Sequence, residues 1–338
     1  MPSVSVLLPC YNAAATLSEA LESLAEQTLT DFEVVLVDDG STDDSLAIAQ
    51  AWADRDRRFR LICQSHRGIV GALNAGLEAC LAPCVARMDA DDRSHPERLA
   101  RQVAFLEAHP DVVVVGCLVK GYPPEQVRQG FSVYLEWLNS LIEDSDIRRE
   151  IFVESPLAHP SVTFRKDWVE RVGGYQDRGW PEDYDLWLRL YLAGARFAKI
   201  SEVLLDWRER PERLTRQDGR YSLENFLRAK AYYLARGPLV DREVVIIWGA
   251  GMMGRRLSKH LVRQGIPLVA FVDIDPRKIG RTRRGVPVIP PGEFPAWWGR
   301  YTSPVLLAAV GARGARPLIR AQVGRFGLRE GLDWWCVA

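Results

Sequence analysis

The chain has 338 residues, 47% of them hydrophobic, and carries equal numbers of basic and acidic residues. This length exceeds that of the usual single domain and predicts two domains with sizeable cores. The charge is unevenly divided, because residues 242–338 carry 16 Lys and Arg against 6 Asp and Glu. These arginines are scattered through glycine-rich sequence rather than gathered in a tail, so we expect no nucleic-acid partner.

Cysteine usage and hydropathy bear on the compartment. The six cysteines show no paired metal-ligand spacing, and several lie in apolar runs, as is typical of a reducing environment. No signal peptide is apparent, and the longest apolar runs fall far short of the roughly 18–20 residues of a membrane helix. We therefore expect a cytoplasmic protein without a transmembrane segment, with peripheral contact at the inner face of the membrane left open. The sequence does not indicate an oligomeric state.

From the amino terminus, apolar runs alternate with segments of helical period. Buried strands are expected at 4–9, 33–39, 59–63, 84–89 and 112–118, with helices near 13–27, 43–53, 69–80 and 96–108 between them. This alternation predicts an α/β fold with a largely parallel sheet and crossover helices. Ligands of such sheets bind at the carboxyl ends of strands, beside a topological switch point.

Two acidic segments follow strands of this predicted sheet. "DDGSTDD" begins at residue 38, and "DADD" occupies residues 89–92. Carboxylates this close together repel one another unless a cation neutralises them. One acidic strand end can accept hydrogen bonds from a nucleobase and ribose, while the other holds Mg²⁺ or Mn²⁺ against a diphosphate. Alternatively, the first segment is only the cap of an ordinary helix.

The second half of the chain contains a separate glycine-rich motif. A helical stretch (120–155), a strand-like segment (196–208), a helix near 222–236 and a short linker (235–243) precede it. "VVIIWGAGMMG" (244–254) then fits a strand, a phosphate-binding turn and a helix. The residues that carry this pattern are Gly249, Gly251, Gly254 and the ribose-binding candidate Asp273.

We therefore expect two domains, at 1–237 and 242–338, the second being a smaller Rossmann-like nucleotide-binding accessory domain. Its expected ligand is NAD or a nucleotide sugar. A structural or docking role and an active oxidoreductase are the alternatives for this domain.

Four ordered segments carry a family resemblance over about residues 2–216. They are "SVLLPCYNAAATLSEALESLAEQTLTDFEVVLVDDGSTDDS", "RGIVGALNAGL", "RMDADD" and "GGY…PEDYDLWLRL". In this order they resemble the family 2 glycosyltransferases of the GT-A fold. The resemblance implies an inverting, metal-assisted enzyme that moves a sugar from a nucleotide-diphosphate donor, such as a UDP-sugar, to a glycan or lipid-linked acceptor in polysaccharide or cell-surface glycan biosynthesis.

Two other functions remain as alternatives. One is a nucleotide-sensing binding protein whose transferase site is degenerate. The other is an NAD-dependent sugar-modifying oxidoreductase that works through the C-terminal domain.

The resemblance also assigns roles on the donor side. It implies that Pro9 and Tyr11 pack on the nucleobase and that Asp39 hydrogen-bonds the nucleobase or ribose. Arg67, in "SHRG", is expected to approach the donor as a cation, although a solvated loop arginine is the alternative.

The D-x-D motif is matched by Asp89 and Asp91, with Asp91 as the main metal ligand and Asp89 reaching the metal, the ribose or the sugar. One departure concerns Arg210. Many relatives have Tyr-Arg-x-His near the end of this domain, whereas this chain has "WRER" and places Arg210 at the His position. Arginine cannot ligate a cation but pairs well with phosphate. Metal dependence is therefore left open.

Acceptor-side residues are expected around "PEDYDLWLRL". Inverting transfer needs a general base opposite the leaving diphosphate, and Asp183 is our candidate. Glu182 is expected to bind the acceptor or, like Asp185, to cap the helix. Trp180 is expected to stack on an acceptor sugar. His159 either contacts a substrate or makes a structural hydrogen bond.

Overall fold

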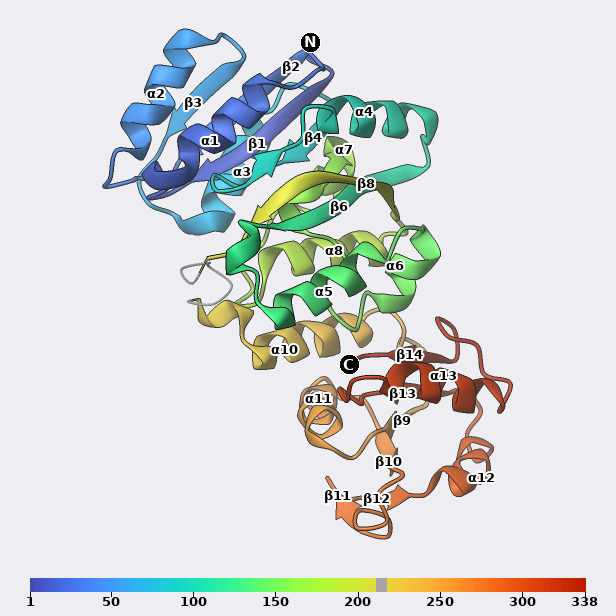
Figure 1. The fold of residues 1–338 in the computed structure, drawn as a ribbon. Helices are drawn as coiled ribbons and strands as arrows, with labels where there is room; N and C mark the ends of the chain where they lie inside the picture. Colours follow the sequence, from blue (N-terminus) through green and yellow to red (C-terminus); the bar gives the residue numbers. More distant parts are fainter. Residues whose placement is uncertain (211–217) are drawn as a thin grey trace. The chain divides into compact units, whose positions relative to one another are not determined.

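The computed structural model describes residues 1–210 and 218–338, and these divide into two compact units (Figure 1). The first unit comprises residues 1–147, 156–178 and the described residues from 182 to 210. The second comprises residues 148–155, 179–181 and 218–338. The division thus differs from the expected boundary at 237–242, because the helix near 222–236 belongs to the second unit.

The first unit alternates strands and helices along most of its length. In chain order its elements are β1 (Val4–Cys10), α1 (Ala14–Ala25), β2 (Phe32–Asp38), α2 (Ser45–Arg55), β3 (Phe59–Cys63), α3 (Gly68–Ala79), β4 (Cys84–Arg87), β5 (Arg93–Ser94), α4 (Arg98–Ala108), β6 (Val112–Tyr122), α5 (Gln129–Asn139), α6 (Asp144–Glu150), β7 (Thr163–Arg165), α7 (Lys166–Arg171), α8 (Glu182–Leu192) and β8 (Arg196–Arg208). The last residues of α6 fall in the second unit.

Among the described residues, eight strands form the first sheet, in the order β3-β2-β1-β4-β7-β6-β8-β5. Strands β1 to β4 are parallel, as expected. The short strand β7 runs antiparallel to both β4 and β6, whereas β6 and β8 pair in parallel over most of their length. After β3 the chain returns to the opposite side of β1. The carboxyl ends of β1 and β4 therefore flank the switch point of this sheet.

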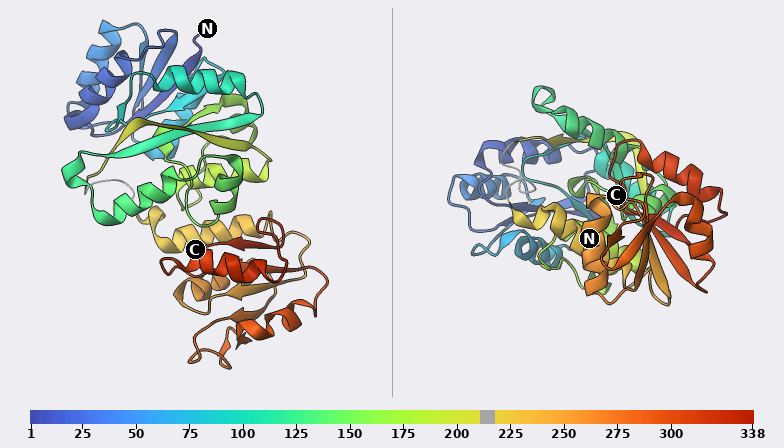
Figure 2. Two further views of the ribbon diagram at one scale, coloured as in Figure 1. Left: turned by 45° about the vertical axis from the view of Figure 1, so that its right-hand side comes forward. Right: turned by 90° about the horizontal axis from the view of Figure 1, so that it is seen from below.

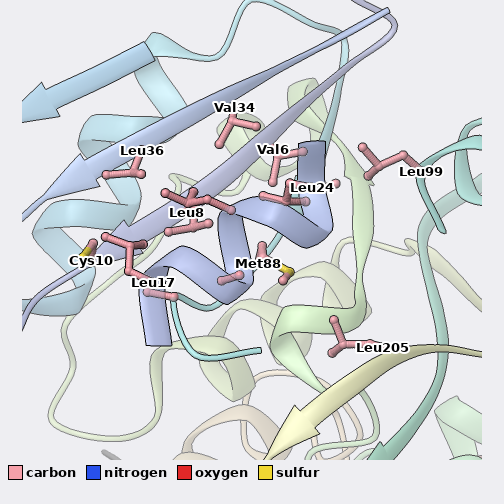
Figure 3. Close-up of a cluster of buried hydrophobic side chains, with 14 of the residues drawn as sticks. Val6, Leu8, Cys10, Leu17, Leu24, Val34, Leu36, Met88, Leu99 and Leu205 are labelled. Atoms are coloured by element: carbon pink, nitrogen blue, oxygen red, sulfur yellow. The ribbon is translucent and has the colours of Figure 1, made fainter. Parts of the chain in front are cut away.

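The core of this unit explains why these segments become strands and helices. Every residue of β1 and β2 is buried, as expected for parallel strands covered on both faces. Helix α1 buries Leu17, Ala20, Leu21 and Leu24, which lie on one helical face. Figure 3 shows Leu17 and Leu24 directed at the side chains of β1 and β2. This packing fixes the strand ends that carry the polar residues of interest.

The second unit has its own sheet. Its elements are α10 (Leu223–Leu234), β9 (Val244–Trp248), α11 (Met252–Arg263), β10 (Leu268–Val272), β11 (Thr282–Arg283), β12 (Val286–Ile289), α12 (Phe294–Trp298), β13 (Pro304–Ala308), α13 (Ala315–Gly324) and β14 (Trp334–Cys336). The strand order is β11-β12-β10-β9-β13-β14, and every pair except β11–β12 is parallel. The right-hand view of Figure 2 shows these strands fanned side by side. The switch point of this sheet lies between β9 and β13.

None of the helices in residues 1–210 and 218–338 combines the length and the apolar character needed to cross a bilayer.

Candidate active site

Asp39 lies just beyond the carboxyl end of β2 and is buried. Its Oδ1 accepts hydrogen bonds from Gln64 Nε2 (2.5 Å) and from the Arg67 backbone N–H (2.8 Å), and its Oδ2 accepts one from the Gly68 N–H (2.8 Å). Gly68 has a φ of 75°, a conformation that glycine adopts without strain. The Asp39 carboxylate therefore holds in place the loop that precedes α3. Arg67 contributes its backbone to this arrangement, while its side chain is exposed.

Tyr11 and His66 form an aromatic pair beside this carboxylate. Their ring centroids are 4.1 Å apart and the rings are stacked, and His66 Nδ1 lies 2.9 Å from Asp39 Oδ2. Tyr11 is 46% exposed, whereas Pro9 is buried inside β1. Of the two residues expected to pack on a nucleobase, Tyr11 thus presents a ring at the surface and Pro9 does not.

Three carboxylates gather in the loop after β4, where the sequence predicted a cation. Oxygens of Asp89, Asp91 and Asp92 all lie within 4.8 Å of one another. Carboxylate oxygens in this arrangement suit Mg²⁺ or Mn²⁺, which take a few protein oxygens together with phosphate and water. The residues expected to hold the metal are therefore close enough to do so.

Arginines of the chain itself also approach this acidic cluster. Asp89 is ion-paired with Arg87, and Asp91 Oδ2 lies 2.9 Å from Arg210 Nε. The Arg208 backbone N–H donates to Asp92 Oδ1 (2.8 Å), and Arg208 Nε donates to the Asp91 carbonyl (2.6 Å). The charge concentrated in the cluster is thus partly balanced within the protein.

Arg87 links the acidic cluster to a buried polar pair. Its side chain is 3% exposed, and its charge acts on both His159 and Tyr175. Burial, assisted by the Arg87 charge, holds the pKa of His159 well below its usual range, so the imidazole is neutral at pH 7. His159 Nε2 lies 2.9 Å from the Tyr175 hydroxyl, and both residues are buried. Of the two roles considered for His159, the structure favours the structural hydrogen bond.

Tyr175 is held in place by Asn74 of α3. Asn74 Oδ1 accepts from the Tyr175 N–H and Asn74 Nδ2 donates to the Tyr175 carbonyl, both at 2.9 Å. The preceding Gly174 has a φ of 63°, and a Cβ there would lie 2.8 Å from Asn74 Oδ1. The double glycine of "GGY" therefore allows this close approach.

The "PEDYD" segment begins α8. Asp183 is half-buried, and its Oδ1 accepts a hydrogen bond from the Tyr184 N–H (2.7 Å). Glu182 is buried, and the charges of Glu182 and Asp183 both raise the pKa of the Tyr175 phenol, although burial is the largest cause. Asp185 is fully buried and ion-paired with Arg189 at 2.7 Å. Asp185 therefore has a structural role, and Asp183 is the less buried carboxylate at the helix start.

Trp180 belongs to the second unit and lies in a different environment from the one expected. It is buried, with its ring centroid 5.5 Å from that of Tyr232 and 6.4 Å from that of Tyr233, both on α10. Arg228 lies over the same ring at 5.6 Å. The face expected to stack on an acceptor sugar is thus packed against a helix.

The glycine turn of the second unit is tightly built. Gly249 has a φ of 115°, and a Cβ on Gly254 would lie 1.9 Å from the Gly249 carbonyl oxygen, whereas a Cβ on Gly251 would meet nothing within 4 Å. Asp273 Oδ2 accepts from the Ala250 N–H (2.9 Å), and Lys278 Nζ lies 3.1 Å from the same carboxylate. Asp273 therefore closes the turn onto β10 and is already engaged by a lysine.

Four residues of the site were missed by sequence reasoning: His66, Asn74, Arg87 and Tyr175. Asn74, Arg87 and Tyr175 stand in segments that carry the family resemblance, and His66 directly precedes one of them, but none has a pattern of its own. Arg87 offers the clearest signal, because a charged residue inside an apolar strand needs a partner.

Comparison with known proteins shows the family to which the chain belongs. The chain belongs to glycosyl transferase family 2, because the model of that family matches residues 5–173. It is 37% identical over 219 residues to the amylovoran biosynthesis glycosyltransferase AmsE of Erwinia amylovora, covering 64% of this chain and 79% of AmsE. It is 30% identical over 242 residues to the Escherichia coli UDP-Gal:alpha-D-GlcNAc-diphosphoundecaprenol beta-1,3-galactosyltransferase, covering 69% and 84% of the two chains. The predicted transferase class is thereby confirmed.

Solved structures share the fold. TarS (residues 1–349) of S. aureus, in complex with UDP-GlcNAc, matches with a TM-score of 0.56 at 22% identity, covering 78% of this chain and 72% of TarS. The mannosyltransferase PcManGT of Pyrobaculum calidifontis, in complex with GDP-Man and Mn²⁺, matches with a TM-score of 0.51 at 22% identity, covering 70% and 64%. The mixed α/β fold is therefore that of GT-A glycosyltransferases.

Proposed function

We propose that the chain transfers a sugar, with inversion, from a UDP-sugar to a glycan or lipid-linked acceptor in the synthesis of a polysaccharide or cell-surface glycan. The observation that carries this proposal is the pair of polar strand ends, after β2 and β4, on either side of β1 at the switch point. The relatives named for amylovoran biosynthesis and for a diphosphoundecaprenol acceptor support it. We propose that the chain meets such an acceptor at the inner face of the membrane.

The donor side is assigned by charge and exposure. Tyr11 stacks on the nucleobase, and Asp39 and the loop around Arg67 bind the nucleobase and ribose. Asp89 and Asp91 hold a divalent ion, because their oxygens are close together and are the ligands that Mg²⁺ and Mn²⁺ prefer. When bound, that ion neutralises charge on the leaving diphosphate.

Asp183 acts as the general base. In the transfer step the acceptor oxygen forms a bond to the anomeric carbon, and the bond from that carbon to the diphosphate breaks. Asp183 takes the proton of the acceptor hydroxyl, and the nucleoside diphosphate leaves with the electron pair. A carboxylate at the start of a helix suits this role because its position is fixed by the helix. Glu182 remains our proposal for an acceptor contact.

Substitution of Asp183 tests this assignment. Asp183→Asn keeps the shape but cannot take a proton, so turnover should fall roughly 10²–10⁴-fold while donor affinity stays near that of the wild type. Turnover is measured as release of UDP from a panel of UDP-sugars and lipid-linked acceptors, and affinity by calorimetry. Loss of affinity with unchanged turnover of bound donor would instead make Asp183 a donor contact.

For the second unit, we propose a Rossmann-like nucleotide-binding module whose ligand is NAD or a nucleotide sugar. The strand order around β9, the glycine turn and the open space at Gly251 support it. Because Lys278 and the Ala250 N–H already engage Asp273, ribose recognition by Asp273 requires Lys278 to move.

Calorimetry with NAD⁺ and UDP-GlcNAc on the whole chain tests this second proposal. Gly251→Phe should abolish binding of NAD⁺ without changing the melting temperature, because that residue faces open space. Two results together would contradict the proposal: NAD⁺ does not bind, and one UDP-GlcNAc binds per chain in both the wild type and Gly251→Phe. This unit would then have a structural role.

A further inference from the structure

The residue that departs from the family pattern, Arg210, lies in the acidic cluster itself. Arg210 Nε is 2.9 Å from Asp91 Oδ2, and the two side chains are 33% and 16% exposed. Asp91 is the residue to which the resemblance assigns the metal. A positive side chain of the protein thus stands where the sequence predicts a positive ion.

Hydrogen bonds fix the backbone near both residues of this contact. Strand β5 follows the cluster directly and pairs with β8 through Arg93↔Asp206 and Ser94↔Leu205. Beyond this pairing, Arg208 bonds to Asp92 with its N–H and to the Asp91 carbonyl with its guanidinium. The end of β8 is therefore tied to the acidic loop, and the approach of Arg210 to Asp91 follows from sheet register rather than from a chance surface contact.

We propose that Arg210 is the resident counter-cation of Asp91 and that it transfers to the diphosphate when a donor binds. A guanidinium and a divalent ion repel each other at one carboxylate, so metal binding at Asp91 weakens the Arg210 contact. A diphosphate offers the freed guanidinium two oxygens in the fork geometry that arginine matches. The donor and the metal therefore bind more tightly together than either does alone. This inference rests on the proposed function for its diphosphate, but its metal competition does not.

The first experiment measures Mn²⁺ binding to the whole chain without nucleotide, by calorimetry and by the loss of the free Mn²⁺ electron paramagnetic resonance signal. Removing the competing charge in Arg210→Gln should tighten Mn²⁺ binding about fivefold or more, the equivalent of roughly 1 kcal/mol for a partly exposed ion pair. Arg101→Gln is the matched control. It removes one positive charge of α4 from an exposed pair with Glu97, the residue before this helix, and should leave Mn²⁺ affinity unchanged.

The second experiment measures binding of UDP, and separately of GDP, in excess chelator. Here the same variant should bind the nucleotide roughly tenfold more weakly than the wild type, because it loses a charge-assisted hydrogen bond to phosphate. Arg210→Lys keeps the positive charge but loses the planar pair of N–H donors of the guanidinium. It should recover part of the nucleotide affinity and keep weak Mn²⁺ binding. Melting curves of each variant confirm that the fold is retained.

Opposite changes in the two affinities support the proposal, because a merely structural arginine would weaken both. Unchanged Mn²⁺ affinity in Arg210→Gln, or unchanged nucleotide affinity in chelator, overturns it. If the wild type binds neither UDP nor GDP under any condition, the proposed donor class fails, and the Mn²⁺ titration still decides whether Arg210 competes for Asp91.

Discussion

Arg87 and Arg210 pair with carboxylates of the same acidic cluster but at different depths. The side chain of Arg87 is almost fully buried, whereas a third of Arg210 remains exposed. A buried guanidinium is costly to move because its charge would lose a partner in a low dielectric, while an exposed one exchanges partners at little cost. We therefore assign Arg87 to permanent positioning of Asp89 and Arg210 to exchange between Asp91 and the donor.

Arg87→Met tests the buried contact. Without the guanidinium, a partly exposed Asp89 loses its partner, so stability should fall by about 2 kcal/mol, less than for a fully buried pair. The Arg87 charge is also one cause of the low pKa of His159, so this pKa should rise in the variant while staying below its ordinary value, since burial remains. Urea unfolding and NMR titration of the imidazole measure the two effects. An unmoved His159 titration would contradict the electrostatic link.

A buried lysine predicts how stability changes with pH. Lys199 Nζ donates to the Leu138 carbonyl, and burial lowers its pKa to about 7. Between pH 7 and its ordinary pKa, the unfolded chain binds more protons at this site than the folded one. The free energy of unfolding should therefore rise with pH in this window, by up to about 1.4 kcal/mol per pH unit.

Urea unfolding at pH 7, 8 and 9 measures this slope. Lys199→Met should reduce it and leave only the part due to Lys230, whose pKa burial lowers to about 8. Lys120→Met, a change to an exposed lysine of β6, should retain the full slope. Equal slopes in the wild type and Lys199→Met would show that Lys199 does not titrate in this range.

At the scale of elements, the start of α11 depends on glycines for two different reasons. Gly254 lies against the backbone of Gly249, so that no side chain fits between helix and turn. Gly251, the N-cap, has a φ of −76° and an open Cβ position. The first glycine serves packing, and the second leaves room above the turn.

These two positions form a matched pair for mutation. Gly254→Ala places a methyl group 1.9 Å from a carbonyl oxygen and should cost roughly 2 kcal/mol or more, since backbone must shift. Gly251→Ala should be neutral or slightly stabilising, because alanine restricts the unfolded chain without strain in the folded one. Thermal unfolding of both variants measures the two effects, and comparable losses would contradict the different roles assigned to the two glycines.

The sequence predicted those elements whose pattern is local. Strands β1 to β4 appear as apolar runs because both of their faces are buried, and the acidic ends after β2 and β4 follow from this assignment. Strand β7 has only three residues, too few to show a period, and its antiparallel pairing depends on contacts distant in the chain. Elements fixed by tertiary contact alone escaped prediction.

The same distinction applies to the site. The spacing of Asp89 and Asp91 is local and was found. The approach of Arg210 to Asp91 depends on the pairing of β5 with β8, and the burial of Trp180 depends on tyrosines about fifty residues further on. Neither contact can be predicted from a short stretch of sequence, because its two partners lie far apart in the chain.

On the scale of the whole molecule, the second unit is not a simple C-terminal segment. Glu150, which is buried, accepts hydrogen bonds from Arg316 and Arg320 of α13, both at 2.5 Å. Lys230 Nζ of α10 donates to the carbonyls of Val153 and Val337. The segment 148–155 is thus bonded to α10 and α13 within this unit, and it cannot be removed without stranding charged groups.

A point variant and a shortened chain test this dependence. Glu150→Ala should lower the stability of the second unit by about 2 kcal/mol, because two partly buried guanidinium groups lose a shared partner. A chain reduced to residues 242–338 should fail to unfold cooperatively, since it lacks both Glu150 and Lys230. The protection of the backbone amides of β9 and β13 against hydrogen exchange is measured in the variant and in the fragment and compared with that in the whole protein. Full protection in the short fragment would contradict this account.

The pairing of Glu150 with α13 has a consequence for synthesis on the ribosome. Arg316 and Arg320 lie 166 and 170 residues after Glu150 in the chain. At about 5–20 residues per second, their translation follows by roughly ten seconds or more. Throughout that interval the nascent chain carries the Glu150 carboxylate without its two guanidinium partners on α13. Completion of this contact therefore requires the translation of α13, and a nascent chain released before that point lacks both α13 partners of Glu150.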